Sequence, residues 1–425
     1  MNRESELATR DGGLRRLHQF VPRAGTQYTT GRNFDLGPGN RDNVSMLSPW
    51  LRHRLLTEQE VLEAVLQQHS LSTANKFVQE VFWRTYFKGW LEHRPAVWEQ
   101  YRSDVTRLLD ALESDGDLFD RYIAAVQGKT GIDCFDAWAA ELVSTGYLHN
   151  HARMWFASIW VFTLNLPWQL GADFFLRHLV DGDPASNTLG WRWVCGLHTR
   201  GKTYLASARN IVSYTNGRFN PTGQLATSAP SVTEPHTVSP EPIRAAQVMY
   251  GDEPFGLLVT EEDNHPESLL ENHAPSAIIA IQATRARSPL PVGKPASEFA
   301  RGALGDTVDR LMTRYGVNGA IYESSDWAEL LVDWATARHL STIVTAYTPV
   351  GIASELLARA AEKLDRYGIK LLQLRRHYDS MAWPYTRQGY FKLKRNIPDI
   401  LDKLREPEPL TALKVAGDRP GRLHS

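Results

Sequence analysis

The chain has 425 residues, of which 42% are hydrophobic and 22% are charged, and its formal net charge is -1. This is the profile of a soluble globular protein, and at roughly 150 residues per domain we expect two or three domains. No run of about 18 apolar residues is present, which excludes a membrane-spanning helix, and the polar start does not resemble a secretory signal. We expect a cytoplasmic protein, since two cysteines are too few for a disulfide framework or a cysteine-ligated zinc site.

The first half of the chain is rich in tryptophan, because ten of the 13 tryptophans lie between Trp50 and Trp193. In this half, apolar residues recur at the 3.6-residue period over residues 55–69 and 74–93, which predicts amphipathic helices. Residues 153–166 are apolar on nearly every side, which is typical of a helix at the centre of a bundle. We therefore predict an all-α domain over residues 14–220.

The composition changes after this region. Residues 221–245 are rich in Pro, Ser and Thr, and we interpret them as a linker. Beyond them, helical segments such as residues 351–367 alternate with short aliphatic or β-branched runs at residues 256–260, 277–281, 319–323, 342–347 and 370–374. This alternation predicts a doubly wound parallel sheet, Rossmann-like in class, over residues 246–405. No dinucleotide-binding motif (GxGxxG) and no P-loop motif (GxxxxGKS or GxxxxGKT) occurs at a strand–helix turn.

The densest polar cluster is formed by residues 181–193, which hold two aspartates, an asparagine and two tryptophans. Two interpretations stay open, a helix-capping loop beside buried tryptophans and a binding site. A carboxylate in an aromatic domain needs a cationic partner, because an unpaired buried carboxylate costs several kcal/mol or shifts its pKa. For Asp181 the candidate partner is Arg153, which lies in the apolar helix.

Sequence motifs of hydrolases and metalloenzymes are missing, since the chain has no GxSxG, HExxH or CxxC. His149 and His151 stand two residues apart and therefore do not share a helix face. We expect no metal site.

Six short motifs follow one another in the first half of the chain, at residues 28–33, 45–51, 80–84, 146–154, 167–168 and 181–193. Together they resemble the flavin-binding core of the cryptochrome/photolyase family, over about residues 15–221. The resemblance implies an FAD cofactor in a folded, U-shaped conformation inside the helical domain. It implies that FAD is held by Tyr28, Ser45, Met46, Leu47, Ser48, Arg84, Asn150, Arg153, Asp181, Gly182, Asp183 and Asn187.

The same resemblance gives the polar residues their roles. Arg153 would pair with Asp181 beside the flavin, Asp183 would hydrogen-bond the flavin ring, and Asn187 would face flavin N5. In such a site the cofactor supplies the electron chemistry and the protein tunes it. An asparagine cannot donate an acidic proton, which favours a persistent flavin anion.

Trp191 and Trp168 match the first two tryptophans of the family's electron-transfer chain. The third, a surface tryptophan, would lie near Asp115, where the sequence has none. Either Tyr122, Trp155 or Trp160 replaces it in the electron-transfer chain, or photoreduction is impaired. As a further alternative, Trp168 and Trp191 are plain core aromatics.

The lesion-binding wall of a photolyase is matched by Glu80, Trp83, Asn150, His151, Met154 and Trp193. Trp83 and Trp193 would stack on a flipped-out pyrimidine dimer. Glu80 would stabilise the dimer during the reaction, and it completes the expected catalytic set with Trp168, Asn187 and Trp191. His151 departs from the family, because photolyases have arginine there and a neutral histidine binds phosphate weakly.

The order of the two halves is a second departure, since photolyases begin with an α/β domain and this chain begins with the helical one. Residues 257–264 resemble the first strand of that α/β domain, and residues 367–372 and 384–392 resemble its end. We therefore interpret the chain as circularly permuted, which costs little when domain termini lie close together. This half could hold a second, antenna chromophore, for which we identify no residues.

Our leading hypothesis is a deoxyribodipyrimidine photo-lyase, an FAD-dependent enzyme that uses blue light to split cyclobutane pyrimidine dimers in damaged DNA. The alternative is a cryptochrome-like photoreceptor that signals through a partner protein without repair. His151, the missing third tryptophan and the near-zero net charge favour this alternative. A third hypothesis is a flavoprotein of this fold that has lost its photochemistry. We expect a monomer.

Overall fold

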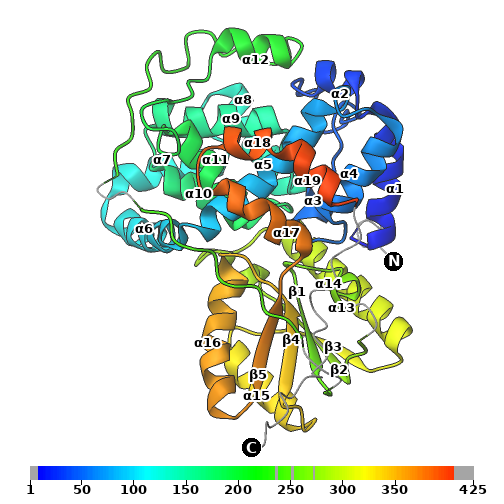
Figure 1. Cartoon of the computed structure of the whole chain (residues 1–425). Coiled ribbons are helices and arrows are strands. Elements are labelled where there is room, and N and C mark those ends of the chain that lie inside the picture. Colours follow the sequence, from blue (N-terminus) through cyan, green and yellow to red (C-terminus); the bar gives the residue numbers. More distant parts are fainter. Residues whose placement is uncertain (1–7, 235–237, 250–252, 271–272, 406–425) are drawn as a thin grey trace, which may run out of the picture.

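The computed structural model describes residues 8–234, 238–249, 253–270 and 273–405. It consists of a helical part and a smaller part built on one β-sheet, which lies below the helices in Figure 1. The main helices of the first part are α1 (Arg10–Phe20), α2 (Thr26–Gly31), α3 (Ser48–Arg52), α4 (Glu58–Gln68), α5 (Asn75–Glu92), α6 (Pro95–Ser114), α7 (Gly116–Val126), α8 (Asp133–Thr145), α9 (Asn150–Ser158), α10 (Trp168–His178), α11 (Pro184–Val194) and α12 (Ala208–Tyr214).

The helices expected from periodicity are present. α4 and α5 lie within the two amphipathic segments, and α9 continues into a π-helical turn, Ile159–Thr163, over the apolar segment. α4 begins where the sequence can satisfy the free N–H groups of a first turn, because Thr57 and Glu60 form a reciprocal capping box. Among the described residues, no helix combines the length and the apolar character that a membrane crossing requires.

The sheet contains five strands, β1 (Gly256–Thr260), β2 (Ala277–Gln282), β3 (Gly319–Glu323), β4 (Thr342–Ala346) and β5 (Lys370–Leu374). They are parallel and stand in the order β3-β2-β1-β4-β5. The predicted parallel sheet is thereby confirmed, and each predicted strand agrees with the observed one to within one residue. β1, β2 and β4 are buried along their whole length, which explains why they consist mostly of aliphatic and β-branched residues.

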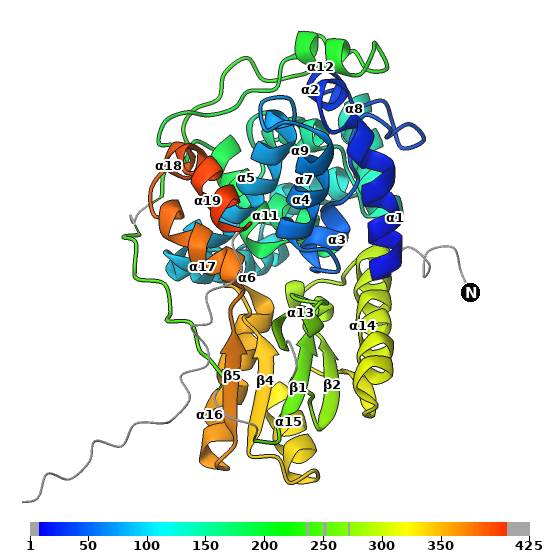
Figure 2. The same cartoon turned by 45° about the vertical axis from the view of Figure 1, so that its right-hand side comes forward.

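Helices cover both faces of this sheet (Figure 2). Successive side chains of a strand point to opposite faces, so Leu257 and Val259 share one hydrophobic cluster with α14 (Lys294–Tyr315). Leu258 belongs instead to the cluster that contains the buried residues of α15 (Trp327–Thr336) and α16 (Ile352–Arg366). A short helix, α13 (Glu267–Leu270), follows β1.

After β5 the chain returns to the helical part. α17 (His377–Ala382), α18 (Tyr390–Arg395) and α19 (Ile397–Lys403) cross the helical part beside α5, in orange and red in Figure 1. Leu393 and Ile400 are buried in the same hydrophobic cluster as Leu17 and Phe82. The last helices of the described region therefore complete a hydrophobic core to which residues near the start of the chain also contribute.

The segment expected to be a linker has no regular structure in residues 221–234 and 238–249, apart from one isolated bridge at Gln247. Parts of it are nevertheless bound to the helical part. The backbone N–H of Glu241 donates to the carbonyl oxygen of His93 at 2.7 Å, and that of Ala226 donates to Thr163 Oγ1 at 3.0 Å.

A buried network of ion pairs joins the sheet to the helical part, and we call it the junction cluster. Glu262, just after β1, lies 2.7 Å from Arg52 and 3.6 Å from Lys88. Asp263 accepts two hydrogen bonds from Arg376, one from Nε and one from Nη2, at 2.7 Å each. The full cluster is Arg52, Arg54, Glu58, Arg84, Lys88, Asp183, Glu262, Asp263, Arg376 and Asp379.

Arg376→Met tests the junction cluster away from the helical part's cavity. The substitution leaves Asp263 as a buried carboxylate without its bidentate partner, so we expect the free energy of unfolding to fall by about 3–5 kcal/mol. Urea denaturation measures this loss. Arg285→Met is the matched control, because Arg285 pairs with Glu323 from a side chain that is 72% exposed, and we expect a change of about 1 kcal/mol or less. Equal changes in the two variants would contradict the prediction.

Candidate functional site: a cavity in the helical part

A cavity of about 620 Å³ lies among the helices, a volume typical of sites for small molecules and cofactors. Its wall is largely made by α5, α9, α11 and the loops that precede α3 and α11. Most of the residues that the sequence singled out meet in this wall. They are Tyr28, Ser45, Met46, Ser48, Glu80, Trp83, Asn150, His151, Arg153, Met154, Asp181, Gly182, Asp183, Asn187, Trp191 and Trp193.

Three of the expected residues lie behind the wall instead of in it. Leu47 is completely buried in a hydrophobic cluster. Arg84 turns toward carboxylates of the junction cluster, and Trp168 stacks on Tyr101 with ring centroids 5.8 Å apart. Of the three, Arg84 contacts a wall residue directly, because its Nη1 lies 3.2 Å from Oδ2 of Asp183.

Several wall residues were missed from the sequence. Phe87 follows Trp83 by four residues on α5, so helical spacing alone places it on the same face. Tyr147 lies inside one of the recognised motifs, whereas Phe175 on α10 gives no such signal.

The expected pair of Arg153 and Asp181 is present, with Nη2 of the arginine 2.8 Å from Oδ2 of the aspartate. Arg153 is held in place by a second hydrogen bond, from Nε to the carbonyl oxygen of Leu148 at 2.9 Å. Oδ1 of Asp181 is buried and has no hydrogen-bond partner among the described residues, and the same is true of Trp191 Nε1. Two residues of the wall therefore hold buried polar atoms without a partner, one an acceptor and the other a donor.

Asp183 serves two purposes. It caps α11 by accepting a hydrogen bond from Ser186 N at 2.8 Å. It also pairs with Lys88 at 2.9 Å and Arg84 at 3.2 Å. Burial opposes the negative charge, but Lys88, Arg84 and Arg52 outweigh burial and hold the pKa of Asp183 well below its ordinary value. The two interpretations of residues 181–193 are therefore compatible, because the loop that caps α11 also lines the cavity.

Asn187 lies one helical turn after Asp183, where its side chain is nearly buried in the cavity wall. Its Nδ2 donates to the carbonyl oxygen of Ala172 on α10 at 2.8 Å, which fixes the plane of the amide. Trp191, one turn further on, packs so closely against Gly171 that any side chain at position 171 would collide with the indole.

Glu80 and Arg32 face each other at the rim, with Arg32 Nη1 2.5 Å from Glu80 Oε1. Burial raises the pKa of Glu80 above its ordinary value, although Arg32 acts in the opposite direction. A carboxyl group with a raised pKa is more ready to carry a proton and to donate it in a hydrogen bond.

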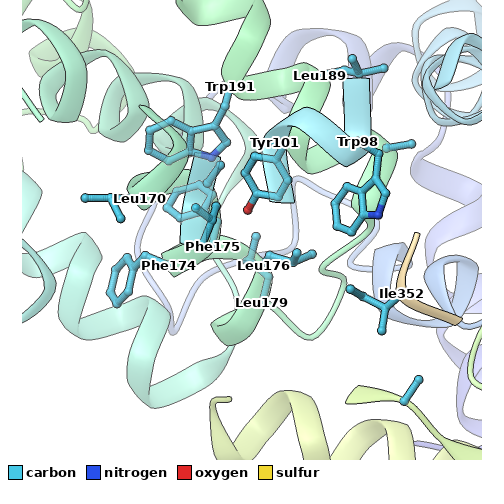
Figure 3. Packing of buried hydrophobic residues seen from close by; sticks show 14 of the residues in the cluster. Trp98, Tyr101, Leu170, Phe174, Phe175, Leu176, Leu179, Leu189, Trp191 and Ile352 are labelled. Carbon is cyan, nitrogen blue, oxygen red and sulfur yellow. The ribbon is translucent and has the colours of Figure 1, made fainter. Parts of the chain in front are cut away.

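The aromatic rings behind Trp191 form two lines. In the first, Trp191 contacts Trp160 edge to face at 6.2 Å, and Trp160 contacts Tyr122 at 6.1 Å. In the second, Trp168 stacks on Tyr101, which lies 5.3 Å from Trp98. Figure 3 shows Tyr101 between Trp191 and Trp98 in the buried core.

The histidines of the cavity region are held neutral. His149 is almost completely buried at the start of α9, and burial lowers its pKa to about 4. His151 stacks on Trp155 at 4.1 Å, and burial lowers its pKa as well. Within the described part of the chain, no group of three or more His, Cys, Asp or Glu residues is arranged to hold a metal ion.

Residues 77–230 match the family model of the FAD binding domain of DNA photolyase. These residues of the helical part are therefore similar to the FAD-binding domain of photolyases, and the cofactor that they indicate is FAD. The residues of the wall fit this cofactor, because they include the hydroxyl-bearing side chains of Tyr28, Ser45 and Ser48, several aromatic rings, and Asp181, whose Oδ1 has no partner among the described residues.

Among curated proteins, the deoxyribodipyrimidine photo-lyase of Synechococcus sp. is 30% identical over 195 residues, 42% of this chain and 37% of the relative. That of Streptomyces griseus is 36% identical over 159 residues, 37% of this chain and 33% of the relative. A class III photolyase structure from Agrobacterium tumefaciens is 26% identical with a TM-score of 0.40, covering 49% of this chain and 43% of that one. The chain thus spans about a third of the length of each of these two curated relatives.

His149→Asn tests the buried histidine. Because the pKa of His149 is about 4 in the folded protein and about 6.5 in an unfolded chain, the unfolded state binds more protons between these values. The stability that this site provides is complete above pH 6.5 and is lost as the pH falls toward 4. Asparagine keeps a helix cap without titrating, so we expect a shallower fall in the urea midpoint between pH 6.5 and 4.5 than in the unaltered protein. Identical slopes would contradict this assignment.

Proposed function

We propose that the protein is an FAD-dependent, light-driven photolyase that repairs cyclobutane pyrimidine dimers in DNA. The observation that carries the proposal is the meeting of Glu80, Trp83, Asn150, Met154 and Trp193 in the wall of the cavity that also holds the residues expected to bind the flavin. Bound FAD would supply light absorption and one-electron chemistry. The chain's own residues would bind, orient and shield the reactants.

At the flavin end, Tyr28 and the segment of residues 45–48 would bind the phosphates and the ribityl chain. The ion pair of Arg153 and Asp181 would orient the ring system, because its geometry is already fixed by the bond from Arg153 to Leu148 O. Asn187, whose amide plane is held by Ala172 O, would present a neutral side chain to the flavin ring. These groups are pre-organised, which reduces the cost of binding.

At the lesion end, Trp83 and Trp193 are half-buried. They would stack on the two bases of an extruded dimer, in the manner of enzymes that read a flipped base. Glu80 would donate a hydrogen bond to a carbonyl group of the dimer, for which its raised pKa suits it. The nearly buried rings of Phe175 and Trp191 in the same wall would exclude water.

The order of the parts supports a circular permutation. The matched domain lies at residues 77–230, and the parallel sheet follows at residues 256–374. We propose that this sheet is a doubly wound, Rossmann-like domain equivalent to the α/β domain with which photolyases begin, divided from residues 14–220 by the linker of residues 221–245. A cytoplasmic location accords with the two free, buried cysteines.

A cryptochrome-like photoreceptor is the second candidate function, and His151 favours it. The imidazole stacks on Trp155 and its pKa is lowered by burial, so it provides no positive charge where the family's photolyases have arginine. Such a protein would keep the flavin, leave dimers intact and signal through a partner protein.

One experiment separates the candidates. The purified protein is checked for flavin by its visible absorption, reduced, and illuminated with blue light in the presence of a dimer-containing oligonucleotide. Loss of dimers in the light and not in the dark supports the photolyase. A yellow protein that photoreduces and leaves the dimers intact supports the photoreceptor, and a colourless protein contradicts both.

Glu80→Gln tests the lesion end separately from the flavin end. Glutamine preserves the shape of the side chain and replaces the acidic hydroxyl donor with a weaker amide donor. A hydrogen bond between neutral groups contributes about 0.5–1.5 kcal/mol, so we expect repair per absorbed light dose to fall about twofold to tenfold. Flavin content, measured by absorption, should not change. Unaltered repair would remove Glu80 from the mechanism.

Trp160→Phe and Trp168→Phe distinguish the two aromatic lines behind Trp191. Trp160 is in direct ring contact with Trp191, whereas Trp168 leads to Tyr101. The family resemblance favours Trp168, so we expect Trp168→Phe to slow photoreduction of the oxidised flavin about tenfold or more, which corresponds to about 1.4 kcal/mol. Monitoring flavin absorption under blue light measures the rate. A larger effect of Trp160→Phe would assign the path to Trp160 and Tyr122.

A further inference from the structure

Both tryptophans of the lesion wall have one ring face covered by a tyrosine from another element. Trp83 stacks on Tyr390 of α18, with ring centroids 3.6 Å apart and planes inclined by 10°. Trp193 stacks on Tyr204, at 5.5 Å and 30°. Each indole therefore has one face left to present to the cavity.

The stack of Tyr390 on Trp83 is the closer of the two, and it is held firmly from behind. Tyr390 is only 6% exposed, and Leu393 in the next turn of α18 is completely buried. The hydroxyl of Tyr390 donates to the carbonyl oxygen of Gln79 at 3.1 Å, across 311 residues of sequence. α18 is thereby fixed along α5, the helix that carries Trp83.

Two more rings contact Trp83. Tyr86 lies nearly perpendicular to the indole at 5.6 Å, and Phe87 is tilted against it at 5.5 Å. With one face covered and these two rings beside it, the half-buried indole has little freedom to change rotamer. A ring that is already oriented loses less entropy when a base stacks on it, so the covering ring contributes to binding without touching the ligand.

We propose that Tyr390 is a positioning residue for lesion recognition, which holds Trp83 in the orientation that stacks on an extruded dimer. The inference rests on the proposed function. The aromatic ring of Tyr390 performs this task, because the ring covers the indole while the hydroxyl points away to Gln79. The residue that orients the wall thus comes from the last described helices of the chain.

The test compares Tyr390→Leu with Tyr390→Phe in the full chain loaded with flavin. Leucine removes the flat ring, whereas phenylalanine keeps it and removes only the hydroxyl. Tyr378→Leu is the matched control, because Tyr378 is a buried tyrosine of α17 that packs on Phe82 of the same α5 and is not part of the cavity wall.

The probes are a duplex oligonucleotide with one thymine dimer and the same duplex without it. Stacking of a base on an aromatic side chain contributes about 1–3 kcal/mol, so partial loss of the oriented wall should reduce the preference for the dimer about tenfold in Tyr390→Leu. In Tyr390→Phe and Tyr378→Leu we expect the preference to stay within about twofold of the unaltered protein. Flavin content and thermal midpoint are recorded for every variant.

The outcomes distinguish a failure of the proposed function from a failure of the inference about Tyr390. An unaltered protein with no preference for the dimer overturns the proposed function, and this inference with it. A clear preference that Tyr390→Leu retains overturns this inference alone, as does an equal loss in Tyr378→Leu. If Tyr390→Leu does not fold, Tyr390→Met replaces it as a flexible side chain of similar length, with the same expected loss and the same readouts.

Discussion

The pairing of Glu262 with Arg52 and Lys88 is the interaction on which the rest of the structure depends. Glu262 belongs to the sheet, whereas Arg52 donates to the carbonyl oxygen of Gly182 at 2.8 Å and Lys88 pairs with Asp183 at 2.9 Å. The loop that lines the cavity is therefore fixed from the far side by the end of β1. Because a buried charge without its partner is costly, neither part can withdraw without disturbing the other.

The junction cluster also bears on whether the sheet can bind a ligand at the carboxyl end of β1. In its strand order the connections reverse direction between β1 and β4, and open parallel sheets commonly bind ligands in the crevice outside the carboxyl ends of strands at such a point. Here Glu262 and Asp263 follow β1 and are bound by Arg52 and Arg376. The end of the strand serves as a structural contact with the helical part.

The sequence predicted those features that local chemistry determines. The five strands were located because short aliphatic or β-branched runs with clear ends alternate with helical segments, and the partner of Asp181 was found because Arg153 stands alone in an apolar helix. Arg84 and Trp168 were placed in or beside the site by motif alone, but a motif gives a residue type and not its neighbours. The stack of Tyr390 on Trp83 joins distant segments, and periodicity shows which residues are apolar without showing what covers them.

The return of α17, α18 and α19 onto α5 has a consequence for biosynthesis. The hydrophobic cluster that contains Tyr86 is completed by Tyr378 and the residues that follow it. At about 5–20 residues per second, translation needs roughly 15 to 60 s to pass from one to the other. During this interval the apolar face of α5 on the nascent chain lacks its native cover, so it is a natural binding site for chaperones and a point of risk for aggregation.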